Sequence, residues 1–236
     1  MTVDSEGLQT SGTVAAALGP LSKDPAPAPM QARSRRTMEK LLTAAERVFV
    51  RDGFAGATVA GIAASARVSV GAFYGRFADK AAFLDAFFER WFARSRSEID
   101  VSDLLASSDG SAVGRVRAYV AQRVSHYRER RAILMAVQAW LATGGGGGAY
   151  ARRRGELADH AVETLLALVG DELARAGVDE REARRRAAFA VWLVAVGAHD
   201  AAMRGDVRNG SLRFAERPLV DSLTAAALGV LGLPQA

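Results

Sequence analysis

The stretch from Thr58 to Lys80 constrains the fold more than any other part of the chain. It predicts two short helices joined by a tight turn, because Thr58 and Ser69 each stand where a hydroxyl group caps the first turn of a helix. The turn falls at residues 66–68, and no acidic residue lies between positions 53 and 78. A short helix pair with hydroxyls, aromatic rings and cations but no carboxylates is suited to docking on a nucleic-acid duplex.

Two further helices are expected to support this pair. Before it, apolar residues recur at steps of three and four from Thr37 to Arg51, which predicts an amphipathic helix that Gly53 ends with a left-handed cap. After it, a helix is expected from Lys80 to about Ser97. That helix carries an aromatic stripe, which is more typical of a core than of a cofactor site: Phe83, Leu84, Phe87, Phe88, Trp91 and Phe92.

Residues 34–84 resemble the DNA-binding domain of the tetracycline-repressor (TetR) family of bacterial transcription regulators. The resemblance is densest at Ser69-x-Gly71-x-Phe73-Tyr74-x-x-Phe77-x-x-Lys80. One departure is Arg67, where the family usually has glycine in the turn. If that position needs a left-handed backbone, arginine costs roughly 1 kcal/mol there.

The sequence and the resemblance together predict a set of DNA-binding residues. Thr58 is expected near a phosphate at a helix N-terminus, Arg67 and Ser69 near base edges or phosphates, and the apolar residues near thymine methyl groups. The resemblance implies that Tyr74 and Lys80 contact phosphate. The full set is Thr58, Arg67, Ser69, Val70, Ala72, Phe73, Tyr74, Arg76 and Lys80.

Some of these residues also have a purely structural interpretation. Thr58 can act as a helix cap alone, Phe73 can pack in the core, and Arg76 can be a solvated charge. These alternatives stay open from the sequence.

The charge of the chain favours an anionic partner, and its composition excludes chemistry that needs cysteine. Residues 33–94 hold 11 Lys and Arg against 6 Asp and Glu, an excess equal to the whole chain's net charge of +5. The absence of cysteine excludes disulfides, thiolate catalysis and cysteine-based zinc sites. Residues 1–32 are rich in Ala, Ser, Gly and Pro, which predicts a disordered tail and not a signal peptide. We expect a cytoplasmic protein.

The rest of the chain is expected to be helical, without strand-like alternation. Loops are expected at 102–111, at the five-glycine run 144–148 and at 204–211, and the last helix at Phe214 to about Leu231. The apolar run 187–198 is too short to span a bilayer, so no membrane anchor is expected. The predicted fold is all-α: a disordered tail (1–32), a helix-turn-helix DNA-binding domain (33–80) and a helical ligand-binding and dimerisation domain (81–236).

The resemblance implies a homodimer formed through the last two long helices, and a small-molecule effector bound within the helical body. The apolar excess of 189–196 and 219–231 fits such an interface. Two recognition helices about 34 Å apart would read a palindromic operator. The effector is unknown, and the candidate ligand-binding residues, each of which can also be ordinary core, are Tyr119, Tyr127, Met135, Trp140, His160, Trp192 and His199.

No catalytic or cofactor pattern stands out. The three histidines lack metal-ligand spacing, and the glycine run lacks the lysine of a phosphate-binding loop. We therefore expect no enzyme, no metal and no cofactor. The sequence favours a dimeric repressor that an effector releases from DNA. The alternatives are an enzyme on a helical bundle and a helical protein whose basic end binds RNA or a partner.

Overall fold

The N-terminal end of the molecule is a three-helix unit, which we call the head: α1 (Pro29–Gly56), α2 (Val59–Ala66) and α3 (Val70–Tyr74). The computed structural model describes residues 29–204, 207–209 and 212–235. Most of the expected tail lies outside the described residues, but 29–32 already belong to α1. The backbone at Gly53 has a positive φ but an extended ψ (φ 69°, ψ 176°), so it kinks α1 instead of ending the helix with the predicted left-handed cap, and helical residues follow it as far as Gly56.

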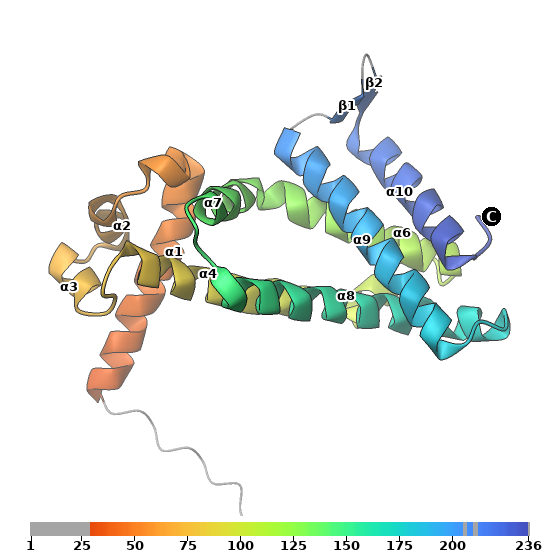
Figure 1. Cartoon of the computed structure of the whole chain (residues 1–236), viewed down its shortest axis with the longest axis horizontal. Coiled ribbons are helices and arrows are strands. Elements are labelled where there is room, and N and C mark those ends of the chain that lie inside the picture. Colours follow the sequence, from red (N-terminus) through yellow and green to blue (C-terminus); the bar gives the residue numbers. More distant parts are fainter. Residues whose placement is uncertain (1–28, 205–206, 210–211, 236) are drawn as a thin grey trace, which may run out of the picture.

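Seven helices follow and form the body: α4 (Lys80–Ser97), α5 (Val101–Ala106), α6 (Ala112–Glu129), α7 (Arg131–Ala142), α8 (Gly147–Arg175), α9 (Glu180–Arg204) and α10 (Glu216–Leu231). Figure 1 shows the head at one end of an elongated molecule, with α4 and α8 leading away from it and α9 and α10 side by side at the other end. The prediction of an all-α fold is confirmed, apart from one short hairpin.

Three local expectations are corrected. The expected loop at 102–111 contains α5, because the Asp100 carboxylate caps that helix and Leu104 is buried in the body. The expected loop at 204–211 contains strand β1 (Val207–Asn209), which pairs antiparallel with β2 (Leu212–Phe214). Helix α8 starts within the glycine run, at Gly147.

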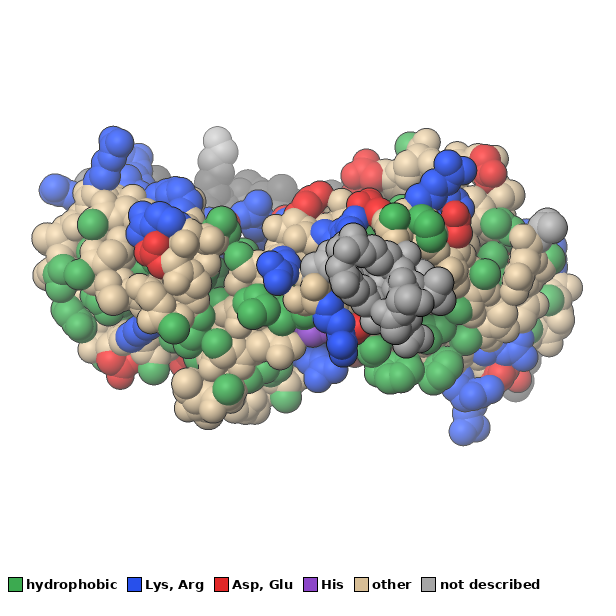
Figure 2. All heavy atoms as spheres, turned by 90° about the horizontal axis from the view of Figure 1, so that it is seen from above, with side chains coloured by type: hydrophobic (Ala, Val, Ile, Leu, Met, Phe, Trp, Pro, Cys, Tyr) green, Lys and Arg blue, Asp and Glu red, His purple; other side chains and the backbone are tan. Residues whose placement is uncertain are grey.

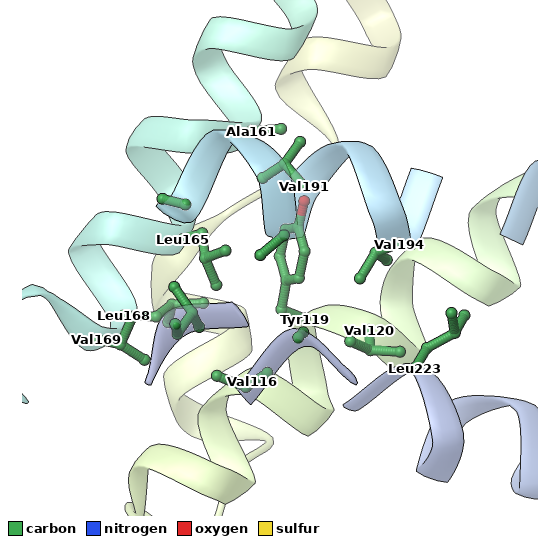
Figure 3. Close-up of a cluster of buried hydrophobic side chains, with 14 of the residues drawn as sticks. Val116, Tyr119, Val120, Ala161, Leu165, Leu168, Val169, Val191, Val194 and Leu223 are labelled. Atoms are coloured by element: carbon green, nitrogen blue, oxygen red, sulfur yellow. The ribbon is translucent and has the colours of Figure 1, made fainter. Parts of the chain in front are cut away.

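Two hydrophobic clusters hold the molecule together. One joins the head to α4 and α7, so it crosses the expected domain boundary at residue 80. Its aromatic side chains include Phe73, Phe83, Phe87 and Trp140. The second cluster lies among α5, α6, α8, α9 and α10. Figure 3 shows its centre, where Tyr119 of α6 stands among apolar side chains of α8, α9 and α10.

Candidate nucleic-acid interface

The two short helices of the head are capped as their sequences predict. The Thr58 hydroxyl accepts a hydrogen bond from the Gly61 amide (3.0 Å), and the Ser69 hydroxyl accepts one from the Ala72 amide (3.0 Å). Each cap residue is exposed and has an extended backbone. The free amides and positive dipole at each N-terminus are therefore presented at the surface, where they favour a phosphate oxygen.

The turn between α2 and α3 is left-handed at Arg67 (φ 56°, ψ 46°), the one non-glycine residue with positive φ in the described part of the chain. The Arg67 and Val68 amides donate to the carbonyls of Ala64 and Ala63, each at 3.0 Å, and so close the end of α2. The family's usual glycine would adopt this conformation without strain. Arg67 keeps an exposed cation at the point where the two helices meet.

Helix α3 divides its predicted contact residues between surface and core. Val70 and Tyr74 are exposed (42% and 55%), and Ala72 is half-buried. Phe73 is fully buried and packs against Phe77 and Phe83, with ring centroids 5.4 and 5.1 Å away. The prediction that Phe73 meets a thymine methyl group is therefore wrong, because a side chain with no exposed surface cannot reach a base.

Arg76 and Lys80 are half-buried and bound within the protein. The Arg76 guanidinium donates to the Ala72 carbonyl at the end of α3 (2.8 Å) and to the Ser34 carbonyl of α1 (3.3 Å). The Lys80 ammonium donates to the Ala57 carbonyl (2.6 Å) and lies 5.4 Å from the centre of the Phe54 ring. Both cations therefore stabilise the head by linking separate segments of it. The Lys80 ammonium has three donors, so it retains hydrogen-bonding capacity for a phosphate.

One bracing residue of the head has no sequence signal. Arg47 of α1 donates to the Ser65 carbonyl in the last turn of α2 (3.1 Å). It satisfies a carbonyl that the helix itself leaves open. The two residues are far apart in the chain, so periodicity alone assigns Arg47 to a solvated face.

The surface charge around these elements is basic. Figure 2 shows Lys and Arg side chains on the head, at the left of that view. Residues 53–78 supply no carboxylate, so the exposed side chains of α2 and α3 carry no negative charge. Such a surface attracts the phosphate backbone of a duplex at any sequence.

The seven candidate ligand-binding residues do not meet at one place. Tyr119 lies in the body cluster, Trp140 in the cluster under the head, and Met135 and Trp192 are exposed (47% and 54%). Tyr127 and His199 do meet, with ring centroids 5.9 Å apart, and the His199 Nε2 atom lies 3.2 Å from the Gln138 amide nitrogen. His160 is half-buried, and its Nε2 atom is enclosed without a hydrogen-bond partner in the described structure.

Trp140 lines an open groove of about 560 Å³ between α4 and the glycine run. Its indole packs against the Phe88 ring in a tilted arrangement, with the centroids 4.5 Å apart and the planes at 33°. Within residues 29–204, 207–209 and 212–235, no three His, Cys, Asp or Glu side chains gather closely enough to hold a metal ion. Nor does any helix of this part combine the length and hydropathy needed to cross a bilayer.

Three of the exposed large apolar side chains of the body form a stripe on α9: Phe189, Trp192 and Val196, exposed by 52%, 54% and 48%. Their spacing of three and four residues places them on one face of the helix, and the Phe189 and Trp192 rings stack with centroids 5.4 Å apart. The apolar excess of α10 is different, because Leu219, Leu223 and Leu228 are buried within the subunit.

Comparisons with known proteins agree with this geometry. The sequence model described as "Bacterial regulatory proteins, tetR family" matches residues 41–87. Similar solved structures include a TetR transcription regulator from Haloarcula marismortui (14% identity, TM-score 0.61, covering 84% of this chain and 97% of that chain). A TetR-family transcriptional regulator from Streptomyces coelicolor is also similar (25% identity, TM-score 0.57, 84% and 95%).

A third similar structure is the regulator FadR from Bacillus subtilis in complex with stearoyl-CoA (15% identity, TM-score 0.54, covering 84% of this chain and 98% of that chain). A comparison with curated protein sequences finds no match. The agreement therefore rests on the head at the level of sequence and on the rest of the chain at the level of fold.

Proposed function

Because this chain belongs to the TetR family of bacterial regulatory proteins, we propose that it is a dimeric, sequence-specific DNA-binding regulator, released from a palindromic operator by a small-molecule effector. Repression, by blocking transcription from a promoter that overlaps the operator, is the outcome this mechanism favours.

The observation that carries the proposal is the exposed surface of α2 and α3. Thr58, Arg67, Ser69 and Tyr74 are exposed there, beside the exposed apolar residue Val70, and no carboxylate interrupts them. In the proposed complex α3 enters the major groove, where Val70 and Ala72 meet thymine methyl groups and Arg67 and Ser69 meet base edges. Thr58, Tyr74 and Lys80 bind phosphates and set the register.

The apolar stripe on α9 supports dimerisation. Three large side chains about half exposed on one helix face cost free energy in water, and a second subunit would bury them. Dimerisation also has a use in recognition, because one five-residue helix reads few bases and two heads read a palindrome.

Effector release would follow from linkage. An effector that binds better to the arrangement with widely separated heads must weaken DNA binding by the same factor. The stearoyl-CoA bound to the Bacillus subtilis regulator of similar fold supports a small-molecule effector here. Helix α4 packs in the head cluster and also on α8 of the body. In the proposed mechanism, effector binding moves α4, and α4 in turn moves the DNA-binding surface.

The test is binding of the purified full chain to duplex DNA from upstream of its own gene, compared with a scrambled duplex of equal length over a salt series. We expect tighter binding to the upstream duplex and a steep loss of affinity with salt. Salt-sensitive binding with equal affinity for both duplexes would favour a general basic surface, such as that of an RNA- or partner-binding protein. No binding at low salt would refute the proposal.

A further inference from the structure

Arg123 of α6 is the one arginine, lysine, aspartate or glutamate among the buried residues of the described chain. Its side chain is 5% exposed, and its Nη1 atom is enclosed without a hydrogen-bond partner. In the described part of the chain it forms no salt bridge with a carboxylate within 4.0 Å. A guanidinium keeps its charge at every physiological pH, so this charge cannot be removed by deprotonation.

Two other partly buried arginines of the body are each paired with a carboxylate. Arg115, on the same helix, pairs with the Glu172 carboxylate, and Arg130, at the start of α7, pairs with Glu98. These arginines are more exposed than Arg123, at 15% and 18%. Leaving the most buried of the three without an anion is costly, because a buried charge that loses hydration without an ion-pair partner is only partly compensated by its contact with the Tyr127 ring.

Glu98 does not fill this gap. Its carboxylate already accepts from Arg130 and from Arg94, and it lies 3.5 Å from the His126 Nδ1 atom. Burial, followed by the charges of Arg123 and Arg130, lowers the pKa of His126 to about 3, so His126 is neutral at pH 7. The local charge near Arg123 therefore stays positive.

The residues around Arg123 indicate which kind of ligand would suit this site. Its guanidinium carbon lies 5.2 Å from the centre of the Tyr127 ring, and one turn earlier Tyr119 is fully buried among the apolar side chains of Figure 3. A partner that enters here must bring one negative charge to the guanidinium and an apolar portion to the neighbouring side chains.

We propose that Arg123 anchors the effector, and that the effector is a small organic carboxylate with an apolar body. This inference rests on the proposed function, because it names the class of ligand that acts on the regulator. Helix α6 packs on α9, which carries the apolar stripe, so a carboxylate that inserts beside Arg123 displaces helices that also set the subunit arrangement.

The test uses three carboxylates, hexanoate, benzoate and phenylacetate, each paired with its uncharged primary amide. Binding to the full chain is measured by calorimetry without DNA, at constant ionic strength. The variants are Arg123→Met, Arg123→Lys and the control Arg152→Met, which removes the same charge from an exposed position on α8.

We expect at least one carboxylate to bind the wild-type chain and Arg152→Met about tenfold or more tightly than its amide. Arg123→Met loses this preference, and Arg123→Lys retains part of it. Without ligand, Arg123→Met melts at a higher temperature than the wild type, because it removes an unpaired buried charge. A purely structural role, in which Arg123 holds the Tyr127 ring, predicts the opposite shift.

Three results overturn the inference. The wild type prefers no carboxylate over its amide, including the case in which none binds; Arg123→Met keeps the preference; or Arg123→Met without ligand melts at a lower temperature than the wild type. The carboxylate binding is measured without DNA, so its outcome does not depend on the outcome of the operator experiment. If the chain prefers a carboxylate but does not bind its operator, the ligand site is supported and the proposed function is refuted.

Discussion

The Lys80 ammonium donates a hydrogen bond to the Ala57 carbonyl at 2.6 Å, which ties the first residue of α4 to the residue before the cap of α2. The same ammonium lies over the Phe54 ring. A displacement of α4 therefore acts directly on the backbone that presents Thr58. Lys80 has a structural contact and, in the proposed complex, a phosphate contact as well.

Lys80→Ala tests both contacts. We expect it to lower the free energy of unfolding by about 1 kcal/mol, because it removes a hydrogen bond to a charged donor. It should also weaken binding to all duplexes alike and flatten the slope of log K against log salt by about one unit. Chemical denaturation and a salt series measure the two effects. The exposed Lys40→Ala is the matched control, and an unchanged slope in Lys80→Ala would remove Lys80 from the phosphate contacts.

Arg67→Gly separates strain from recognition. Glycine adopts the observed φ of 56° without penalty, so we expect the free energy of unfolding to rise by about 1 kcal/mol. Arg67→Ala keeps the strained backbone and removes the guanidinium, so it should not gain this stability. Both variants should change which operator sequence is preferred, which a competition assay with single-base operator variants measures. An unchanged preference would mean that Arg67 reads no base.

The fold of the head could be predicted from the sequence because its signals are local. The hydroxyl caps Thr58 and Ser69 and the boundaries of α3 and α4 follow from residues a few positions apart. For Phe73 the sequence allows two interpretations, a base contact and a core position. A five-residue helix carries too little periodicity to decide which of its sides faces the core.

The remaining features depend on tertiary contacts. Helix α5 forms in a serine-rich segment because Leu104 is buried against the body. Arg123 falls on the apolar face of α6 with Val116, Val120 and Val124, a position that could have marked it from periodicity alone. The lack of a carboxylate beside it is visible only in three dimensions.

Trp192→Glu tests the proposed dimer. A carboxylate in the middle of the α9 stripe would be buried by a second subunit, so we expect monomers and a loss of operator affinity of about 100-fold or more. Analytical ultracentrifugation and operator binding measure these effects. Leu105→Glu adds the same charge at a 45% exposed apolar residue of α5 and should leave both unchanged. A dimeric Trp192→Glu chain would place the interface elsewhere.

The buried His126 should make the protein less stable in mild acid. Its pKa is lowered from 6.5 to about 3, first by burial and then by Arg123 and Arg130, so below pH 6.5 the unfolded chain binds a proton that the folded chain does not. The free energy of unfolding should therefore fall by about 1.4 kcal/mol per pH unit from this group between pH 6.5 and 3. Urea denaturation at pH 7.5 and 5 should show a smaller loss in His126→Gln than in the wild type. Equal losses would contradict the assignment.

The glycine run offers a matched pair of substitutions three residues apart. Gly145 lies against the buried indole of Trp140, and a methyl group there would overlap the ring, which is held in place by Phe88. We expect Gly145→Ala to lower the free energy of unfolding by about 1–3 kcal/mol, since the ring cannot move without disturbing its packing. A Cβ on Gly148 meets nothing within 4 Å, and this residue lies in α8. Gly148→Ala should therefore be neutral or stabilise by up to about 1 kcal/mol, through the higher helix propensity of alanine. Urea denaturation of the two variants measures the difference, and equal stability would mean that the run does not pack on Trp140.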